Sequence, residues 1–263
     1  MDLGIKGRTA LVTASSRGLG WAAACRLSQE GVRVALCGRD RGRIDAARQR
    51  LVDVTGGEAL AFAVDVTDND AVSGMVRSLE ETWGSVDILV CNAGGPPAGS
   101  YEDFGLDDYR RATELNLMST IRLCYQVLPR MKAKGWGRII TITSVAAKQP
   151  LENLILSNTA RAGVLGFGKT LAGQVAAAGI TVNSLLPGYT RTERIEELAV
   201  RFVKDGQGSE EDFYDKVTAS IPARRMGRPE EFAQAVAFLA SEGAAYITGV
   251  ALQVDGGFCS GIL

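Results

Sequence analysis

Short apolar segments alternate along the whole chain with longer amphipathic stretches, and this alternation limits the fold more than any other feature. The apolar segments are rich in Val, Ile and Leu without polar alternation, which is typical of strands buried on both faces of a sheet. They predict strands at residues 8–14, 32–38, 58–66, 86–94, 137–144, 179–188 and 250–257. The stretches between them predict helices at residues 18–30, 40–54, 68–83, 106–134, 153–178 and 229–241.

This order of strands and helices predicts an α/β fold with a seven-stranded parallel sheet and helices on both faces. The chain has 263 residues, of which 46% are hydrophobic and 22% are charged, and no Pro-, Gly- or Ser-rich linker divides it. We therefore expect residues 1–263 to form a single domain. An insertion at residues 190–225 is charged and partly helical. Because open α/β sheets bind ligands beyond the carboxyl ends of their strands, we interpret it as a lid, with a solvated pair of surface helices as the alternative.

Composition excludes several classes of function. The net charge is −1, so no basic footprint for nucleic acid is present, and no apolar run approaches the roughly 18 residues of a membrane span. The N-terminus lacks a secretory leader pattern, and we expect a cytoplasmic protein. There is no histidine, which excludes Ser-His-Asp and Cys-His catalysis. The five cysteines form no C-x-x-C pair, so we expect no metal site and reduced packing residues at Cys25, Cys37, Cys91, Cys124 and Cys259.

A glycine-bearing turn joins the first strand directly to the first helix in "TALVTASSRGLGWAAACRL". Backbone N–H groups at the start of a helix, aided by the helix dipole, bind a pyrophosphate. The position of the turn, after a strand and before a helix, strengthens an otherwise weak motif. It predicts a doubly wound Rossmann domain that binds a dinucleotide.

Six motifs in order resemble those of the short-chain dehydrogenases/reductases. They are the turn at residues 13–20, "CNAG" at 91–94, Asn116, Ser144, "VNSLLPGYTRTE" at 182–193 and "VDGG" at 254–257. The resemblance covers nearly the whole chain and is greatest to members that resemble 3-oxoacyl-acyl-carrier-protein reductases. Ala14 replaces the first glycine of the turn, a change that is tolerated if the φ angle of this residue stays negative. Cys91 replaces an asparagine.

The resemblance also implies which residues hold the cofactor. An acidic residue closing the second strand would select NAD(H), but Gly38 and Arg39 occupy the selecting positions, and Arg17 lies across the turn. Two guanidiniums suit a phosphate dianion, so we expect NADP(H) rather than NAD(H), unless Asp40 turns inward and reverses the preference. The predicted cofactor-binding residues are Thr13, Ser15, Ser16, Arg17, Gly18, Leu19, Gly20, Arg39, Asp65, Val66, Asn92, Ala93, Gly94, Arg161, Pro187, Gly188, Thr190 and Thr192.

Two expected catalytic residues are replaced. The resemblance places a tyrosine at position 157 and a lysine at position 161, where this chain has Ser157 and Arg161. A serine hydroxyl is a poor general acid, and an arginine does not normally deprotonate, so proton transfer is what these changes remove. The predicted catalytic residues are Ser144, Asn116, Ser157, Arg161 and Lys148. The proton could come from Lys148, from Tyr189 or from a water polarised by Arg161.

Three functions fit these residues. The first is an NADP(H)-dependent oxidoreductase of a small-molecule carbonyl or alcohol with non-standard proton delivery. The second is a catalytically inactive NADP(H)-binding sensor or partner subunit, because a fold persists when its chemistry is lost. The third is dehydration or isomerisation with the cofactor merely bound. Small residues in the helix near residues 162–179 and an apolar C-terminus, together with the resemblance, predict a homotetramer or homodimer.

Overall fold

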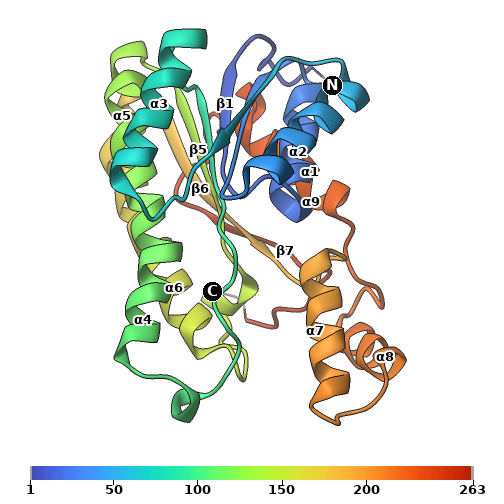
Figure 1. Ribbon diagram of the computed structural model, residues 1–263. Coiled ribbons are helices and arrows are strands. Elements are labelled where there is room, and N and C mark those ends of the chain that lie inside the picture. The colour runs from blue at the N-terminus through green and yellow to red at the C-terminus, as the bar shows by residue number, and fades with distance from the viewer. Residues whose placement is uncertain (1, 262–263) are drawn as a thin grey trace.

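The seven predicted strands form one parallel sheet in the order β3-β2-β1-β4-β5-β6-β7 (Figure 1). The structure is a computed structural model that describes residues 2–261. Its strands are β1 Thr9–Val12, β2 Arg33–Gly38, β3 Ala59–Ala63, β4 Ile88–Cys91, β5 Gly137–Ile142, β6 Ile180–Pro187 and β7 Ala251–Val254. The strand order reverses between β1 and β4, so the predicted doubly wound fold is confirmed.

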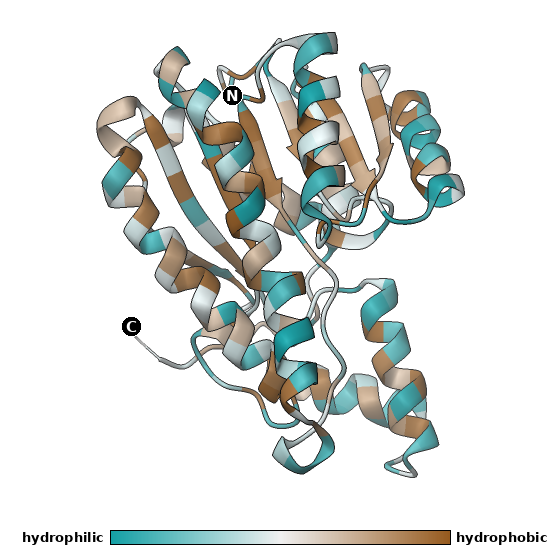
Figure 2. Ribbon diagram, turned by 60° about the vertical axis from the view of Figure 1, so that its left-hand side comes forward, coloured by the Kyte–Doolittle hydropathy of each residue, from teal (hydrophilic) through white to brown (hydrophobic). Residues whose placement is uncertain are grey.

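Helices cover both faces of the sheet. On one face lie α1 Gly18–Gln29, α2 Arg41–Thr55 and α9 Pro229–Ala240, and on the other lie α3 Asn69–Trp83, α5 Ser119–Lys134 and α6 Ile155–Val175 (Figure 1). The strands are apolar along most of their length, whereas the helices present polar residues outward (Figure 2). None of the helices within residues 2–261 is long and apolar enough to cross a membrane.

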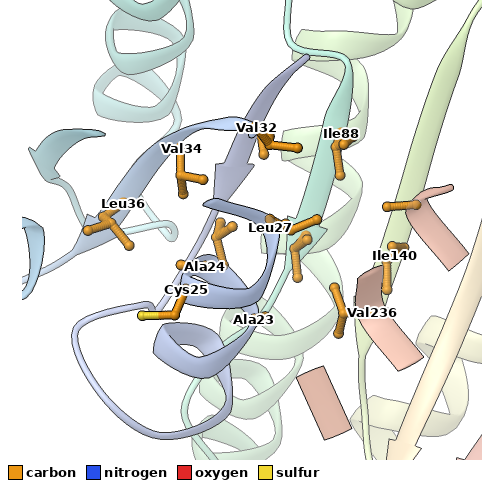
Figure 3. Close-up of a cluster of buried hydrophobic side chains, with 14 of the residues drawn as sticks. Ala23, Ala24, Cys25, Leu27, Val32, Val34, Leu36, Ile88, Ile140 and Val236 are labelled. Atoms are coloured by element: carbon orange, nitrogen blue, oxygen red, sulfur yellow. The ribbon is translucent and has the colours of Figure 1, made fainter. Parts of the chain in front are cut away.

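The core between α1 and the sheet depends on small residues of the helix. Ala23, Ala24 and Leu27 of α1 are fully buried, and they face the strand residues Val34 and Ile140 (Figure 3). An alanine side chain allows a helix to approach the sheet closely, and interiors packed at this density tolerate little change in volume. Close packing of α1 therefore fixes the place of its N-terminus beside β1.

The long helical region predicted at residues 106–134 is confirmed, but the structure adds a π-helical turn within it. It consists of α4 Leu106–Thr113, a π-helical turn at Glu114–Met118, and α5. Asn116 lies in this turn, and its Nδ2 donates to the carbonyl of Gly94 over 3.0 Å. A π turn inserts an extra residue into the helix and is frequent at functional sites. Sequence periodicity does not register such a single-residue insertion.

The insertion at residues 190–225 contains α7 Glu193–Lys204 and α8 Glu210–Ser220, and it is called the lid below after the interpretation of the sequence, which stays a prediction. It projects beyond the carboxyl end of β6 (Figure 1). The lid has a small apolar cluster of its own, formed by Ile195, Val217, Ile221 and Met226, against which Tyr189, Phe258 and other half-buried residues pack. The C-terminal segment thus contributes to the lid, although Ile262 and Leu263 of the apolar terminus lie outside the described residues.

Candidate active site

The predicted site residues come from loops that follow neighbouring strands. The turn at residues 13–20 follows β1, Asn92 follows β4, Ser144 follows β5, and Gly188 follows β6. Because β1, β4, β5 and β6 are adjacent and parallel, these loops meet at one edge of the sheet. That edge lies beside the point where the strand order reverses, which is where open α/β sheets bind ligands.

The turn after β1 is held by buried hydroxyl groups. Thr13 Oγ1 donates to the Asn92 carbonyl over 2.7 Å and accepts from the Asn92 N–H over 2.9 Å. Ser15 Oγ donates to the Val12 carbonyl over 2.8 Å and accepts from the Cys37 N–H over 3.0 Å. Both side chains are therefore occupied within the protein. They shape the turn, and their assignment as cofactor-binding residues stays a prediction.

Ala14 departs from the expectation for this turn. Its φ angle is 45°, in the left-handed region, so the condition under which the added methyl group would be tolerated without strain is not met. The cause is the surrounding structure: the Ala14 carbonyl accepts from Asn92 Nδ2 over 3.2 Å, and the neighbouring residues Thr13 and Ser15 are fixed by their hydroxyls. An L-residue held in this conformation costs roughly 1–2 kcal/mol.

We expect Ala14→Gly to raise the free energy of unfolding by about 1 kcal/mol, because glycine adopts a positive φ without strain. In a domain of this size, that increase raises the melting temperature by roughly 2–4 °C. The control is Ala46→Gly at an exposed position inside α2, which should lower stability by about 1 kcal/mol. Thermal unfolding that shows both variants destabilised would contradict the strain at Ala14.

The start of α1 approaches the turn as closely as a glycine allows. A Cβ atom on Gly20 would lie 2.4 Å from the Ala14 carbonyl oxygen and 2.8 Å from Asn92 Nδ2. Gly18 has a φ angle of 59°, and no side chain caps the helix through its N-cap residue Arg17. The first N–H groups of α1 thus point to the loop edge, where a helix start favours an anion. Ser16 and Leu19 lie half-buried in the same segment.

At the end of β2, the side chain of Asp40 caps α2. Its Oδ1 accepts from the Arg43 N–H over 2.8 Å, so the carboxylate is committed to the helix start and Arg39 lies exposed beside it. Partial burial raises the pKa of Asp65, but hydrogen bonds from Thr67 and the charge of Arg39 outweigh this effect and hold that pKa below its usual range. The next residue, Val66, is buried and its carbonyl accepts from Arg122.

Ser157 and Arg161 lie one turn apart on α6, and both are about 8% exposed. Arg161 Nε donates to Ser157 Oγ over 3.2 Å, and its Nη1 donates to the carbonyls of Ile142 and Thr143 over 3.2 and 2.8 Å. Burial, and secondarily the charge of Arg194, lower the pKa of Arg161 to about 10. Arg161 therefore remains a cation at neutral pH and ties α6 to the end of β5.

Ser144 begins the short 3-10 turn Val145–Ala147, and its Oγ accepts from the Ala146 N–H over 3.1 Å. A cavity of about 10 Å³, the size of a single water molecule, lies between β5, α6 and the π turn. Arg161, Thr143 and Asn116 line it, and within the described residues the buried Oδ1 of Asn116 has no hydrogen-bond partner. The structure thus brings Asn116 and Arg161 to one polar cavity behind the loop edge.

The two proposed alternative proton donors have different surroundings. Lys148 ends the 3-10 turn after Ser144 and is half-buried. Tyr189 packs edge-on against Phe258 with ring centroids 5.3 Å apart, and burial raises the pKa of Tyr189 above its usual value. These contacts make Tyr189 part of the lid cluster. The C-terminal segment also reaches the loop of Ser144, since the Ser260 N–H donates to Gln149 Oε1 over 3.1 Å.

The lid lies over the glycine turn, a contact that sequence reasoning missed. Arg17 Nη2 is 3.0 Å from Glu197 Oε1 of α7, and Thr192 and Glu193 lie beside Gly18. Thr190 is buried near the end of β6, next to Pro187 and Gly188. The glycine turn and the segment after β6 are therefore brought together by these contacts of residues 192–197. No pattern in the sequence links positions 17 and 197.

Comparison with known proteins gives the same picture over the full length. A family model described as Enoyl-(Acyl carrier protein) reductase matches residues 13–259. The 3-oxoacyl-acyl-carrier-protein reductase FabG of Vibrio cholerae is 35% identical over 255 residues, which cover 97% of this chain and 98% of that protein. L-sorbose reductase from Gluconobacter frateurii, solved with NADPH and L-sorbose, is 35% identical, covers 100% of both chains and superimposes with a TM-score of 0.95.

A variant of actinorhodin polyketide ketoreductase solved with NADPH is 34% identical, with a TM-score of 0.93, and the match covers 97% of this chain and 98% of that one. These relatives are named as reductases, and the two solved structures superimpose on this chain over nearly its whole length. The motifs, the sheet and the comparisons therefore lead to one assignment. The chain belongs to the short-chain dehydrogenase/reductase superfamily and resembles its 3-oxoacyl-acyl-carrier-protein reductases and ketoreductases.

Proposed function

We propose that the protein is an NADP(H)-dependent oxidoreductase that interconverts a carbonyl and a hydroxyl group on a small molecule. The observation that carries this proposal is the loop edge itself. There Arg17 directly precedes the uncapped start of α1, Arg39 follows β2, and the carboxylate of the next residue, Asp40, is committed to α2. Two guanidiniums and a helix start suit the phosphates of NADP(H). The NADPH complexes of L-sorbose reductase and of the ketoreductase support the same cofactor.

The nicotinamide, when bound, supplies or accepts a hydride, and the residues of this chain would position the other reactant. In the pattern that the sequence resembles, Ser144 orients the carbonyl oxygen through its hydroxyl. Arg161 would hold the ribose side of the cofactor with a fixed positive charge, because its guanidinium is anchored to two carbonyls of β5 and its loop. Cofactor and substrate positioning are thus retained.

Proton delivery is the altered step. Ser157 and Arg161 stand where the family pattern has tyrosine and lysine. Arg161 donates to Ser157 Oγ, which leaves the serine O–H free to donate a hydrogen bond outward. An aliphatic hydroxyl has a pKa far above neutral pH, so it polarises a carbonyl but does not release its proton. We therefore propose that the proton comes from Lys148 or from a water molecule, and that Tyr189 does not supply it because it packs against Phe258.

The same observation favours a second candidate. If neither Lys148 nor water delivers a proton, the protein would bind NADP(H) without turnover and act as a sensor or as a partner subunit. Its mark would be tight binding of NADPH with no consumption of it in the presence of any carbonyl compound.

The test is a calorimetric titration of NADPH and NADH into the purified protein. We expect NADPH to bind at least tenfold more tightly than NADH, because hydrogen bonds between charged groups contribute about 1.5–3 kcal/mol each. Arg39→Gln should remove most of the difference in affinity between NADPH and NADH. The control is Arg41→Gln, which removes the same charge from the exposed first residue of α2, where Arg41 pairs with Asp45. This control should leave the difference in affinity unchanged. Binding of neither cofactor would reject both candidates.

We also propose that the protein assembles as a homotetramer or homodimer. Large apolar side chains are exposed on two faces. One face, around α4 and α5, exposes Tyr101, Leu106, Met118 and Tyr125. The other, formed by α9, β7 and the segment between them, exposes Phe238, Tyr246, Val250 and Leu252. We expect light scattering to give two or four times the mass of one chain, whereas the mass of a single chain would contradict the assembly.

A further inference from the structure

The lid places two carboxylates over the turn that is proposed to bind the cofactor phosphates. Glu197 Oε1 is 3.0 Å from Arg17 Nη2, and Glu193 Oε2 lies 3.7 Å from the point where a Cβ on Gly18 would be. A negative charge beside an anion-binding turn opposes the ligand. In the free protein, the ion pair with Arg17 explains why the Glu197 carboxylate lies at this turn.

We propose that Glu197 is a determinant of cofactor choice, because it occupies the Arg17 guanidinium until the 2′-phosphate of NADP(H) displaces it. The inference rests on the proposed function, which assigns Arg17 to that phosphate. A phosphomonoester carries close to two negative charges at neutral pH and three acceptor oxygens, so it is a stronger partner for a guanidinium than one carboxylate is.

The exchange is easy because the ion pair is exposed and the carboxylate has another partner. The side chains of Arg17 and Glu197 are 52% and 47% exposed, and pairs of this kind contribute little to stability. When Arg17 leaves, Glu197 Oε2 still has Arg194 Nη1 at 3.4 Å on the same helix. Neither charge is left buried and unpaired.

Two consequences follow for the lid. NADPH detaches α7 from the glycine turn at residue 17, whereas NADH has no 2′-phosphate and leaves the pair intact. Glu197 thus reduces the affinity for NADPH but not for NADH. It also makes the contact between the lid and the glycine turn depend on which cofactor is bound. The hydrogen bond from Arg201 of α7 to the Ala98 carbonyl does not involve Arg17 and should persist when the cofactor phosphate binds.

The experiment measures the Kd of NADPH, NADH and adenosine 2′,5′-bisphosphate by calorimetry in the wild-type protein, Glu197→Gln and Glu196→Gln. Glu196 is the matched control, since it is an exposed glutamate on the same helix that forms no ion pair within the described residues. We expect Glu197→Gln to tighten NADPH and the bisphosphate about two- to fivefold and to leave NADH unchanged. Glu196→Gln should change none of the three.

A double-mutant cycle with Arg17→Gln completes the test. In the Arg17→Gln background, Glu197→Gln should no longer tighten the binding of NADPH, because the guanidinium for which Glu197 and the 2′-phosphate compete is absent. An unchanged Kd in Glu197→Gln, an equal gain in Glu196→Gln, or a gain that persists without Arg17 would each overturn the role of Glu197 while the proposed function stands. Failure of the wild-type protein to bind either NADPH or the bisphosphate would overturn both.

Discussion

The double variant Ser157→Tyr/Arg161→Lys is expected to reduce carbonyl compounds about 10²- to 10⁴-fold faster than the wild-type chain, the range that positioned proton transfer contributes. A tyrosine titrates near about 10, and a neighbouring cation lowers that value toward neutral pH. The wild-type serine has no such proton to give. The gain should appear in kcat, with the affinity for NADPH changed little.

Two single variants separate the roles of the pair. Ser157→Tyr alone retains the cation of Arg161 and should recover part of the gain, whereas Arg161→Lys alone leaves the serine and should recover none. The measurement is NADPH consumption with a panel of ketones and 3-oxoacyl thioesters over a range of pH. The active variant should gain an ionisation below pH 10 in its kcat profile. A double variant that binds NADPH but shows the wild-type rate would contradict the proposed proton defect.

The second large effect is expected at Gly20. Gly20→Ala should lower the free energy of unfolding by about 3 kcal/mol, the upper range for overpacking, and weaken NADPH binding more than tenfold. The new methyl group would lie 2.4 Å from a backbone carbonyl oxygen that other bonds hold in place, so α1 must move away from the turn. That movement also displaces the helix start from the phosphate position.

Gly74→Ala is the control for this change. Gly74 is exposed inside α3, and a Cβ there would meet no atom within 4 Å. Alanine should therefore raise stability by roughly 0.5–1 kcal/mol through its better helix propensity. Chemical denaturation gives both values. If Gly20→Ala unfolds like the wild type, the contact between α1 and the turn is looser than the structure indicates.

Much of the fold follows from local pattern. The seven strands and the helices around them were predicted within a few residues, because apolar runs of strand length and glycine turns are local signals. The predicted strand at 86–94 ends at Cys91 in the structure, since Asn92 turns to bond Thr13. The π turn at Glu114–Met118 could not be predicted, because helical periodicity does not register one inserted residue; within this turn Asn116 bonds Gly94 on a different loop.

The candidate site divides in the same way. Motif order placed Ser144, Ser157 and Arg161 on the correct elements, but not the bonds that anchor Arg161 to β5. The positive φ of Ala14 and the internal bonds of Ser15 arise from tertiary contacts, and residue type alone does not reveal them. The ion pair between Arg17 and Glu197 spans 180 positions and depends on how the lid docks.

The hydroxyl bonds of Thr13 and Ser15 have a consequence for how the protein meets its cofactor. They join the turn to β2 and to the loop after β4, so the turn opens only when the centre of the sheet opens with it. The N–H groups of Thr13 and Ser15, which donate to the carbonyls of Val90 and Cys37, should then exchange with solvent as slowly as the globally protected core. The turn is already ordered when the protein folds. Binding a dinucleotide therefore requires little further ordering of the turn, and little affinity is lost for that reason. The turn at residues 13–20 is thus rigid before the cofactor binds. Any change of conformation on binding is then expected in the lid, which lies over this turn.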